Sequence, residues 1–335
     1  MQAAGTTRND SVGILATARY LPERRQDLGD ILAREGLQDS MAAASGIGVT
    51  GVHVFEGESP TDMALAVSRL VLDEAGLTPL DLDAIIDFSV MPQRYVEPAW
   101  SMSNELQAEL GAKKAFTLGY SGGGCANLHA GLKFARALIR ANADVDRVLL
   151  VAADQAIAGN RVIAADGPVT VLGDGASAVI VARGTGKAEI VGTALRSNGH
   201  MHDVLNIPGG GMAHPTRLDL YRLTLDADKL ASVDRMGELR GLVDKLLGRH
   251  GLSGSDIGRF VTSNISLEDT RHFGETMNAN GRLASNGFAA HGHLHSSDLV
   301  FNMLELMAGD VPADTHVVMA SHGLGFLYGA TLLKF

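Results

Sequence analysis

The chain has 335 residues, 46% of them apolar and 20% charged, which excludes a disordered protein and suggests two domains or two halves. Its 38 acidic residues outnumber 28 basic ones, for a formal net charge of −10, and no basic stripe is visible, which argues against nucleic-acid binding. The single cysteine, Cys125, excludes a disulfide framework and a multi-thiolate zinc site. The sequence has no apolar run of about 20 residues, which predicts a cytoplasmic protein that does not enter a membrane.

Strands alternate with helices along the first half of the chain. Residues 11–20 form a predicted strand, and Ser59 followed by Pro60 opens a helix that continues to about Ala75. The next segments are predicted as a strand at 84–90, a helix at 100–110, a strand at 114–118, a helix at 126–140, a strand at 148–153 and two strands within 169–183, broken at 173–175. This alternation predicts parallel strands joined by helices, hence an α/β layered fold.

The second half repeats this plan. Its segments are predicted as a strand at 189–195, a long helix at 231–247, a strand at 260–262, helices at 267–277 and 296–307, and strands at 317–320 and 326–333. Both halves end on a glycine turn before a last strand, at 173–182 and at 323–333, which suggests an internal duplication. The boundary is expected near residue 185, dividing the chain into halves 1–185 and 186–335.

The surroundings of Cys125 are the most informative local feature. The segment 118–138 (LGYSGGGCANLHAGLKFARAL) reads as a strand end, a glycine-rich turn, the cysteine and a helix. A thiol at a helix N-terminus is stabilised as a thiolate, and the three glycines allow a sharp turn and close approach of a substrate. The alternative is an inert cysteine packed under a helix start, but the glycine turn favours a nucleophile.

Several motifs in order resemble a known superfamily. The motifs are YSGGGCANLHAGLKFARALI, DRVLLVAAD, VLGDGASAVIVA, PGGG and SHGLGFLYGATLLKF. Together they resemble the thiolase superfamily and, within it, β-ketoacyl-ACP synthase III, over nearly the whole chain. The resemblance implies a five-layered αβαβα fold of two pseudo-symmetric halves, a homodimer and an acyl intermediate on Cys125. It also implies an oxyanion hole made by the backbone N–H groups of Cys125 and of the turn near Leu324.

Two departures from this family bear on the chemistry. Condensing members carry a Cys-His-Asn triad, and the positions of the His and the Asn match Ser263 and His293 here. Losing one oxyanion donor costs about a hundredfold to a thousandfold in rate, so the exchange at Ser263 argues against decarboxylative condensation. His293 instead precedes Asp298 by five residues, near a predicted helix start, so the carboxylate can orient the ring. The set Cys125, His293 and Asp298 resembles the ketosynthase-like acyltransferases of natural-product (secondary-metabolite) pathways.

Other residues remain candidates for the site. His295 is a rival base, while His200 and Ser263 are candidates for acid–base chemistry or substrate binding. His200 and His202 also have a metal-like spacing without partners, and solvated loop histidines are the plain alternative. Three further residues, Met91, Trp100 and Met102, are candidates for an acyl pocket, or else simply core.

The donor is left open by the sequence. Gly167 stands where the family has an Arg that helps to grip coenzyme A, so the donor is either an acyl-CoA or an acyl carrier protein thioester. A basic run on one predicted helix could receive an acidic carrier protein, although a solvated helix face is the default; its members are Arg235, Arg240, Lys245 and Arg249. No permanently bound cofactor or metal is expected.

Three functions compete. The favoured one is an acyltransferase that loads Cys125 from a thioester and passes the acyl group to a hydroxyl or amine of a small molecule. The runner-up is a decarboxylative condensing enzyme of the synthase III type with an altered triad, in which Asn264 or His200 replaces the missing His. The third is an inactive partner subunit of a heterodimeric synthase, which would have no need of a nucleophile at Cys125.

Overall fold

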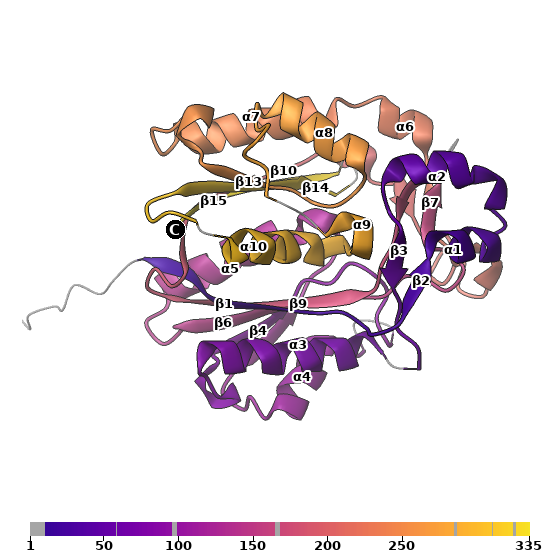
Figure 1. Ribbon diagram of the computed structural model, residues 1–335. Helices are drawn as coiled ribbons and strands as arrows, with labels where there is room; N and C mark the ends of the chain where they lie inside the picture. Colours follow the sequence, from indigo (N-terminus) through magenta and orange to yellow (C-terminus); the bar gives the residue numbers. More distant parts are fainter. Residues whose placement is uncertain are drawn as a thin grey trace, which may run out of the picture.

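The chain folds into five stacked layers in which helices and sheets alternate (Figure 1). The computed structural model describes residues 11–57, 59–95, 99–164, 168–284, 287–309, 311–323 and 326–335. Two helices lie in the middle layer, strands lie on both sides of them, and further helices cover the outer faces. This arrangement confirms the predicted α/β class and its five-layered αβαβα organisation.

One side of the middle layer is formed by strands of the first half. In spatial order these are β1 (Val12–Tyr20), β9 (Gly175–Arg183), β6 (Arg147–Asp154), β4 (Ala84–Asp87) and β5 (Phe116–Gly119). Strand β4 runs parallel to β5 and β6, as the strand–helix alternation predicts, whereas β9 is antiparallel to β6 and β1. Every residue of β4 is buried, since helices cover both faces.

The other side is formed by strands of the second half. Their order is β13 (Arg259–Val261), β14 (His316–His322), β15 (Leu327–Lys334) and β10 (Ala188–Ser197). The two sets of strands are joined at one edge, where Gly13 of β1 pairs with Glu189 of β10. The boundary expected near residue 185 falls in the connection between β9 and β10.

The helices occupy three layers. The middle layer holds α5 (Asn127–Ala141) and α10 (Asp298–Ala308). One outer layer holds α3 (Pro60–Ala75) and α4 (Met102–Leu110), and the other holds α7 (Arg235–Gly248) and α8 (Leu267–Thr276). Helix α3 starts as its sequence predicts, because the Asp62 carboxylate accepts hydrogen bonds from the backbone N–H and hydroxyl of Ser59.

Shorter elements cover one flank of the layers. They are β2 (Arg25–Asp27), α1 (Leu28–Arg34), α2 (Met41–Ile47), β3 (Gly51–His53), β7 (Val162–Ala164), β8 (Pro168–Val171), β11 (Leu205–Asn206), β12 (Thr224–Leu225), α6 (Ala227–Ala231) and α9 (Phe288–His291). The first of the two strands predicted within 169–183 is β8, which pairs with β7 in a ribbon separate from the main sheet. The glycine turn at 173–175 therefore separates two sheets as well as two strands.

The predicted helix at 231–247 corresponds to α7, which begins later than predicted, and a separate short helix, α6, precedes it. Helix α6 ends at Ala231, and α7 begins only at Arg235, where the Asp234 carboxylate accepts the backbone N–H of Gly237. The predicted helix at 296–307 likewise begins later. A single 3₁₀ turn, His295–Ser297, precedes α10, which starts at Asp298. The Asp234 carboxylate fixes the start of α7, and the 3₁₀ turn delays the start of α10. A prediction from hydrophobic periodicity detects neither feature.

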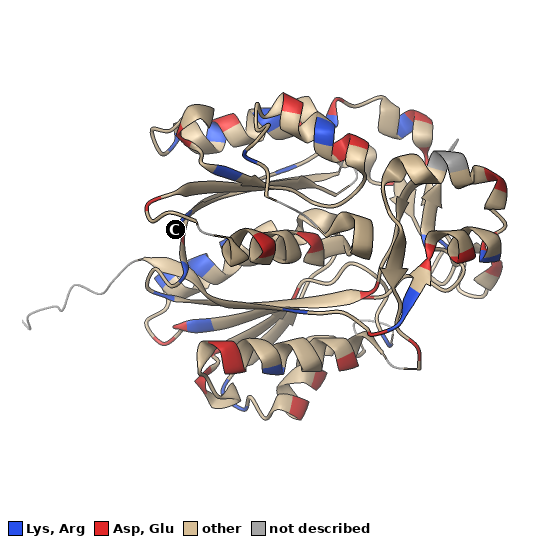
Figure 2. Ribbon diagram, viewed as in Figure 1, with Lys and Arg blue, Asp and Glu red and all other residues tan. Residues whose placement is uncertain are grey.

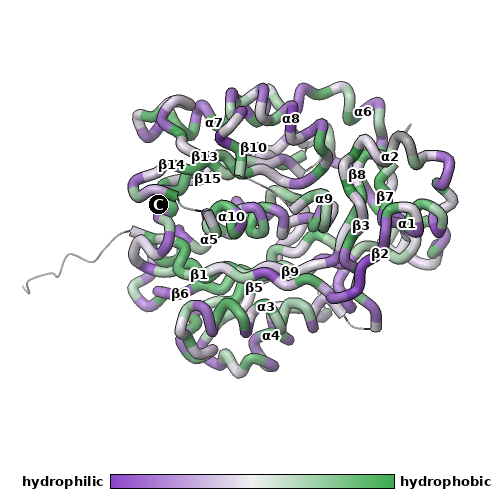
Figure 3. Tube along the Cα trace, in the orientation of Figure 1, coloured by the Kyte–Doolittle hydropathy of each residue, from purple (hydrophilic) through white to green (hydrophobic). Residues whose placement is uncertain are grey.

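One apolar core spans the middle of the molecule. It combines residues of both halves, among them Val12 of β1, Leu128 of α5, Leu299 of α10 and Leu333 of β15. Figure 3 shows apolar residues along the strands between the helix layers, and Figure 2 shows that charged residues lie mainly on the outer helices and loops. Within the described ranges, no helix has the length and apolar character needed to cross a bilayer.

Candidate active site

Cys125 lies at the junction between strand β5 and helix α5. It sits in a 3₁₀ turn, Gly124–Ala126, that leads directly into α5, and its side chain is buried. Gly124 has a φ of 56°, and a Cβ there would lie 3.1 Å from the Cα of Gly323. Glycine is therefore required for this turn to meet the turn before β15. Cys125 therefore lies at the N-terminal end of α5, where the helix dipole favours negative charge.

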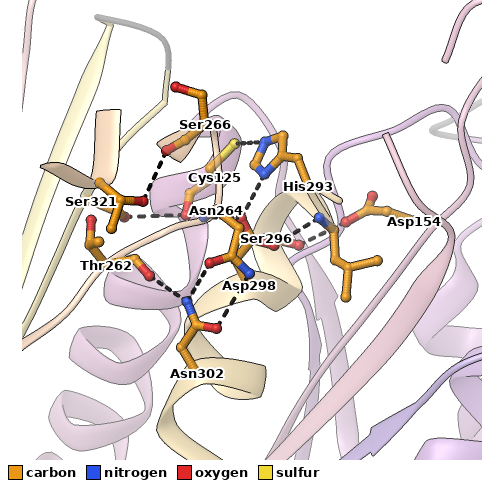
Figure 4. Close-up of polar contacts among 12 residues, drawn as sticks. Cys125, Asp154, Thr262, Asn264, Ser266, His293, Ser296, Asp298, Asn302 and Ser321 are labelled. Atoms are coloured by element: carbon orange, nitrogen blue, oxygen red, sulfur yellow. Dashed lines mark hydrogen bonds and ion pairs between the residues drawn. The ribbon is translucent and has the colours of Figure 1, made fainter. Parts of the chain in front are cut away.

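The structure brings Cys125, His293 and Asp298 together (Figure 4). The Sγ of Cys125 lies 2.9 Å from Nε2 of His293, and Nδ1 of His293 lies 2.6 Å from Oδ2 of Asp298. All three side chains are buried. The sulfur comes from the first half of the chain and the other two side chains from the second, so the sequence-predicted set assembles only in the complete fold.

The Asp298 carboxylate is held by backbone donors. Its Oδ2 accepts the N–H of Asn264 at 2.6 Å, and its Oδ1 accepts the N–H of Leu294 at 2.7 Å. Asp298 is also the first residue of α10, where the helix dipole stabilises a negative charge. The carboxylate therefore has a fixed position from which it orients the His293 ring.

The backbone of His293 is fixed in the same way. Its N–H donates to the carbonyl of Val171 at 2.8 Å, and its carbonyl accepts the N–H of Gly173 at 3.1 Å. A Cβ on Gly173 would lie 2.2 Å from the carbonyl oxygen of His291, so the glycine turn after β8 permits this contact. The position of the ring is thus fixed by the backbone hydrogen bonds of His293 and by the contact of its Nδ1 with Asp298.

The charges around His293 favour its protonated form. Burial alone would lower the pKa of His293, but the Cys125 sulfur and the Asp298 carboxylate outweigh burial and raise that pKa well above its usual value. An imidazolium at this position stabilises a thiolate on Cys125. The arrangement is that of an activated nucleophile with an oriented base.

This shift predicts the pH dependence of Cys125 alkylation. Because the raised pKa keeps His293 protonated beyond about pH 6.5, its positive charge stays beside the sulfur at neutral pH, and the iodoacetamide rate should change less between about pH 6 and pH 8 in wild type than in His293→Ala. His200→Ala is the matched control and should keep the wild-type profile. Identical profiles for wild type and His293→Ala would contradict the ion pair.

Two other predicted site residues lie elsewhere, and a third falls outside the described residues. His200 is exposed on a 3₁₀ turn, Gly199–Met201, and does not line the cavity around Cys125. Ser263 is buried but is likewise absent from the lining of that cavity. Leu324, the expected second oxyanion donor, lies outside the described residues, as does Gly167, although the neighbouring Gly323 lines the cavity.

His295 lies beside the three central side chains. It lines the cavity, and its ring centroid is 5.3 Å from that of His293. Burial lowers the pKa of His295 to about 3, so this ring is neutral. In the part of the chain that the structure describes, His295 has no carboxylate contact like the one between Nδ1 of His293 and Asp298. His293 is therefore the stronger base. Among the described residues, no group of three or more potential His, Cys, Asp or Glu ligands could hold a metal ion.

Two buried carboxylates that support the site were missed by the sequence analysis. Asp154, at the end of β6, accepts the N–H groups of Val90 and Met91 and the hydroxyl of Ser296, all at 2.8 Å. It ties a cavity wall to the turn that carries His295, and burial raises its pKa. Asp174 makes a two-pronged pair with Arg161, with both N–O distances at 2.7 Å. Their one sequence signal is a carboxylate at a strand end or in a glycine turn.

Of the three predicted acyl-pocket residues, one lines the cavity around Cys125. Met91 lines the cavity, whereas Met102 is buried in the core beneath α3, and Trp100 packs against that core. The basic run on α7 is partly neutralised, since Arg240 pairs with Asp244 and Arg235 lies 3.8 Å from Asp269.

Comparisons relate this geometry to known proteins. Residues 122–199 match the family model for 3-oxoacyl-[acyl-carrier-protein] synthase III. The β-ketoacyl-[acyl-carrier-protein] synthase III of Campylobacter curvus is 23% identical over 328 residues, covering 96% of each chain. The solved 3-oxoacyl-(acyl carrier protein) synthase III of Pseudomonas aeruginosa has a TM-score of 0.80 at 21% identity, covering 97% of this chain and 98% of that one. The solved acyltransferase ChlB3 has a TM-score of 0.77 at 22% identity, covering 97% of each chain.

Proposed function

Because this chain is a thiolase-superfamily relative of β-ketoacyl-ACP synthase III, we propose that it is an acyltransferase that works through an acyl-Cys125 intermediate. It takes the acyl group from an acyl-CoA or acyl-ACP thioester and passes it to a hydroxyl or amine of a small molecule. The observation that carries this proposal is the continuous chain of contacts from Cys125 through His293 to Asp298. The fold shared with the acyltransferase ChlB3 is compatible with it.

The proposed reaction has two steps. In the first, the Cys125 thiolate attacks the acyl carbonyl carbon, the bond from that carbon to the carrier sulfur breaks, and the His293 imidazolium gives its proton to the departing carrier thiolate. In the second, neutral His293 takes the proton of the acceptor O–H or N–H while the acceptor heteroatom bonds to the acyl carbon. The thiolate of Cys125 leaves, and the starting ion pair is restored.

The condensing alternative has less support from the site. Its two substitutes for the missing histidine are Asn264 and His200, and neither lines the cavity around Cys125. The Asn264 side chain instead exchanges hydrogen bonds with Asn302, and His200 is exposed. The enolate formed when malonyl-ACP loses CO2 beside Cys125 would therefore lack the second side-chain donor that condensing enzymes of this family use.

Two measurements test the proposal: the intact mass of the protein after incubation with acyl donors, and the release of labelled CO2 from malonyl-ACP. With a panel of acyl-CoA and acyl-ACP donors, the chain should gain the mass of one acyl group and should lose it again when a hydroxyl- or amine-bearing acceptor is added. Malonyl-ACP should release no labelled CO2 at a catalytic rate. Labelled CO2 together with a β-ketoacyl product would establish the condensing alternative, and the absence of any adduct would favour the inactive-subunit reading.

We also propose that the protein is a homodimer. Strand β5 is the last strand in the sheet order, and its Phe116 and Leu118 are each 45% exposed. An exposed apolar edge strand favours pairing, and pairing with a second copy across a twofold axis would bury both side chains. Light scattering at micromolar concentration should give twice 35.1 kDa, and Leu118→Glu, which opposes like charges across the axis, should give a monomer. A monomeric wild type would refute the proposal.

A further inference from the structure

A second, larger chamber adjoins the cavity that holds the sulfur of Cys125. The first cavity has a volume of about 250 Å³ and the second of about 540 Å³. Four residues line both of them: Val90, Met91, Ser121 and Ile207. The two spaces therefore share a wall, and a molecule in the larger one would have to extend past these four residues to reach the sulfur of Cys125.

The linings of the two chambers differ in chemistry. The small one is mainly apolar beyond its catalytic groups, with Ile163, Leu205, Leu223 and Phe326 on its walls. The larger one is lined by three tyrosines, Tyr95, Tyr120 and Tyr221, together with polar side chains that include Gln93 and Arg94. An acyl chain bonded to Cys125 suits the apolar space, which leaves the aromatic and polar space for the other substrate.

The glycine run that follows Pro208 lets the ring of Tyr221 pack closely against the backbone in the wall of the larger chamber. A Cβ on Gly210 would lie 2.8 Å from the Tyr221 ring, and a Cβ on Gly209 would lie 2.3 Å from the carbonyl oxygen of Arg217. Gly210 also has a φ of 82°, which side chains rarely adopt. The run of glycines thus allows an aromatic ring to rest directly against backbone at the chamber wall.

A second ring of the larger chamber, that of Tyr120, is fixed by its own contacts. The hydroxyl of Tyr120 donates to the carbonyl of Asn127 at 2.7 Å, and its ring meets Phe134 edge-on at 5.7 Å, so Tyr120 is held rigidly. The amide nitrogen of Gln93 donates to the carbonyls of Met91 and Ala153, which fixes this side chain in the lining as well.

We propose that the larger chamber is the acceptor site and takes a planar aromatic molecule that carries a hydroxyl or amino group. This inference rests on the proposed function. The aromatic ring of the acceptor packs against Tyr221 and Tyr120. The nucleophilic O–H or N–H gives its proton to His293, its heteroatom bonds to the acyl carbon, and the bond from that carbon to the Cys125 sulfur breaks.

Matched acceptor pairs test this inference. The acyl-enzyme is formed first and is then discharged by phenylethanol or cyclohexylethanol, and by phenylethylamine or cyclohexylethylamine, with release of the adduct followed by intact mass. Each pair has the same nucleophile and differs only in the planarity of its ring. The aromatic member should reach half-maximal discharge at about a tenfold lower concentration.

Variants at the wall make the test specific. Tyr221→Ala should remove the aromatic preference without changing the rate at which Cys125 is loaded, whereas Tyr221→Phe, which keeps the ring, should retain the preference. Met212→Ala is the matched control, since Met212 belongs to the same loop and is 95% exposed. Equal discharge by both members of each pair, or slower loading in Tyr221→Ala, overturns this inference alone. A chain that no donor loads overturns the proposed function and this inference with it.

Discussion

Replacing Cys125 with Ala is expected to abolish the acyl adduct and to reduce acyl transfer by about 10⁵- to 10⁶-fold, as loss of the nucleophile does in other triad enzymes. The chain offers no substitute, because Cys125 is its single cysteine. Its sulfur also lies 2.9 Å from Nε2 of His293. Intact mass after incubation with a loading donor measures the adduct, and acceptor acylation measures the transfer.

The conservative variant separates chemistry from folding. Cys125→Ser keeps a side chain of similar size that can donate to His293, so the folded state should be retained, but a hydroxyl is a far weaker nucleophile than a thiolate. If Cys125→Ser is loaded slowly and Cys125→Ala is not loaded at all, the acyl group is carried by the side chain at position 125. An adduct that persists in Cys125→Ala would show that another residue carries it.

The second large effect is expected at His293. Replacing it with Ala removes both the partner of the thiolate and the base for the acceptor, so discharge of the acyl-enzyme should slow by about 10⁴-fold, the upper range for general base catalysis. Binding of the donor should weaken much less, because the ring acts on the reacting atoms. Single-turnover discharge of a pre-formed adduct isolates this step from loading.

Asp298→Asn should be less severe, with discharge slowed by about 10²-fold, because it disturbs only the orientation and charge of His293. It also has a structural cost. Both carboxylate oxygens of Asp298 accept backbone N–H groups, those of Asn264 and Leu294, and an asparagine amide can accept at one end only. The buried donor left without a partner should cost about 1–3 kcal/mol of the free energy of unfolding. An Asp298→Asn variant that discharges as fast as wild type would contradict the positioning role of the carboxylate.

The three central side chains were accessible to sequence reasoning for local reasons. The glycine turn places Cys125 at a helix start, and the short spacing from His293 to Asp298 leaves the carboxylate at the first residue of α10, within reach of the ring. Each of these two signals spans only a few residues, where the backbone geometry is constrained. The alternation of strands and helices is likewise a local pattern and predicts the α/β class, whereas the five layers were implied by the family resemblance.

Residues that act through distant contacts gave no comparable signal. Asp154 joins strand β6 to a turn 142 residues later, and the wall shared by the two chambers is assembled from segments far apart in the chain. His200 was a candidate because of its motif, yet its turn points it to solvent. Which side chains enter a cavity depends on how the loops pack, and that is a property of the whole fold.

The shared apolar core has a consequence for how the molecule unfolds. Because α5 and α10 lie between both sets of strands, and one core draws on residues from each half, neither half would keep a covered interior on its own. Denaturant should therefore melt the two halves in one cooperative transition, with no populated state in which one remains folded. If the halves arose by duplication, the ancestral single copy would have needed a second copy to complete its interior, so the covalent link would have replaced an association between separate chains.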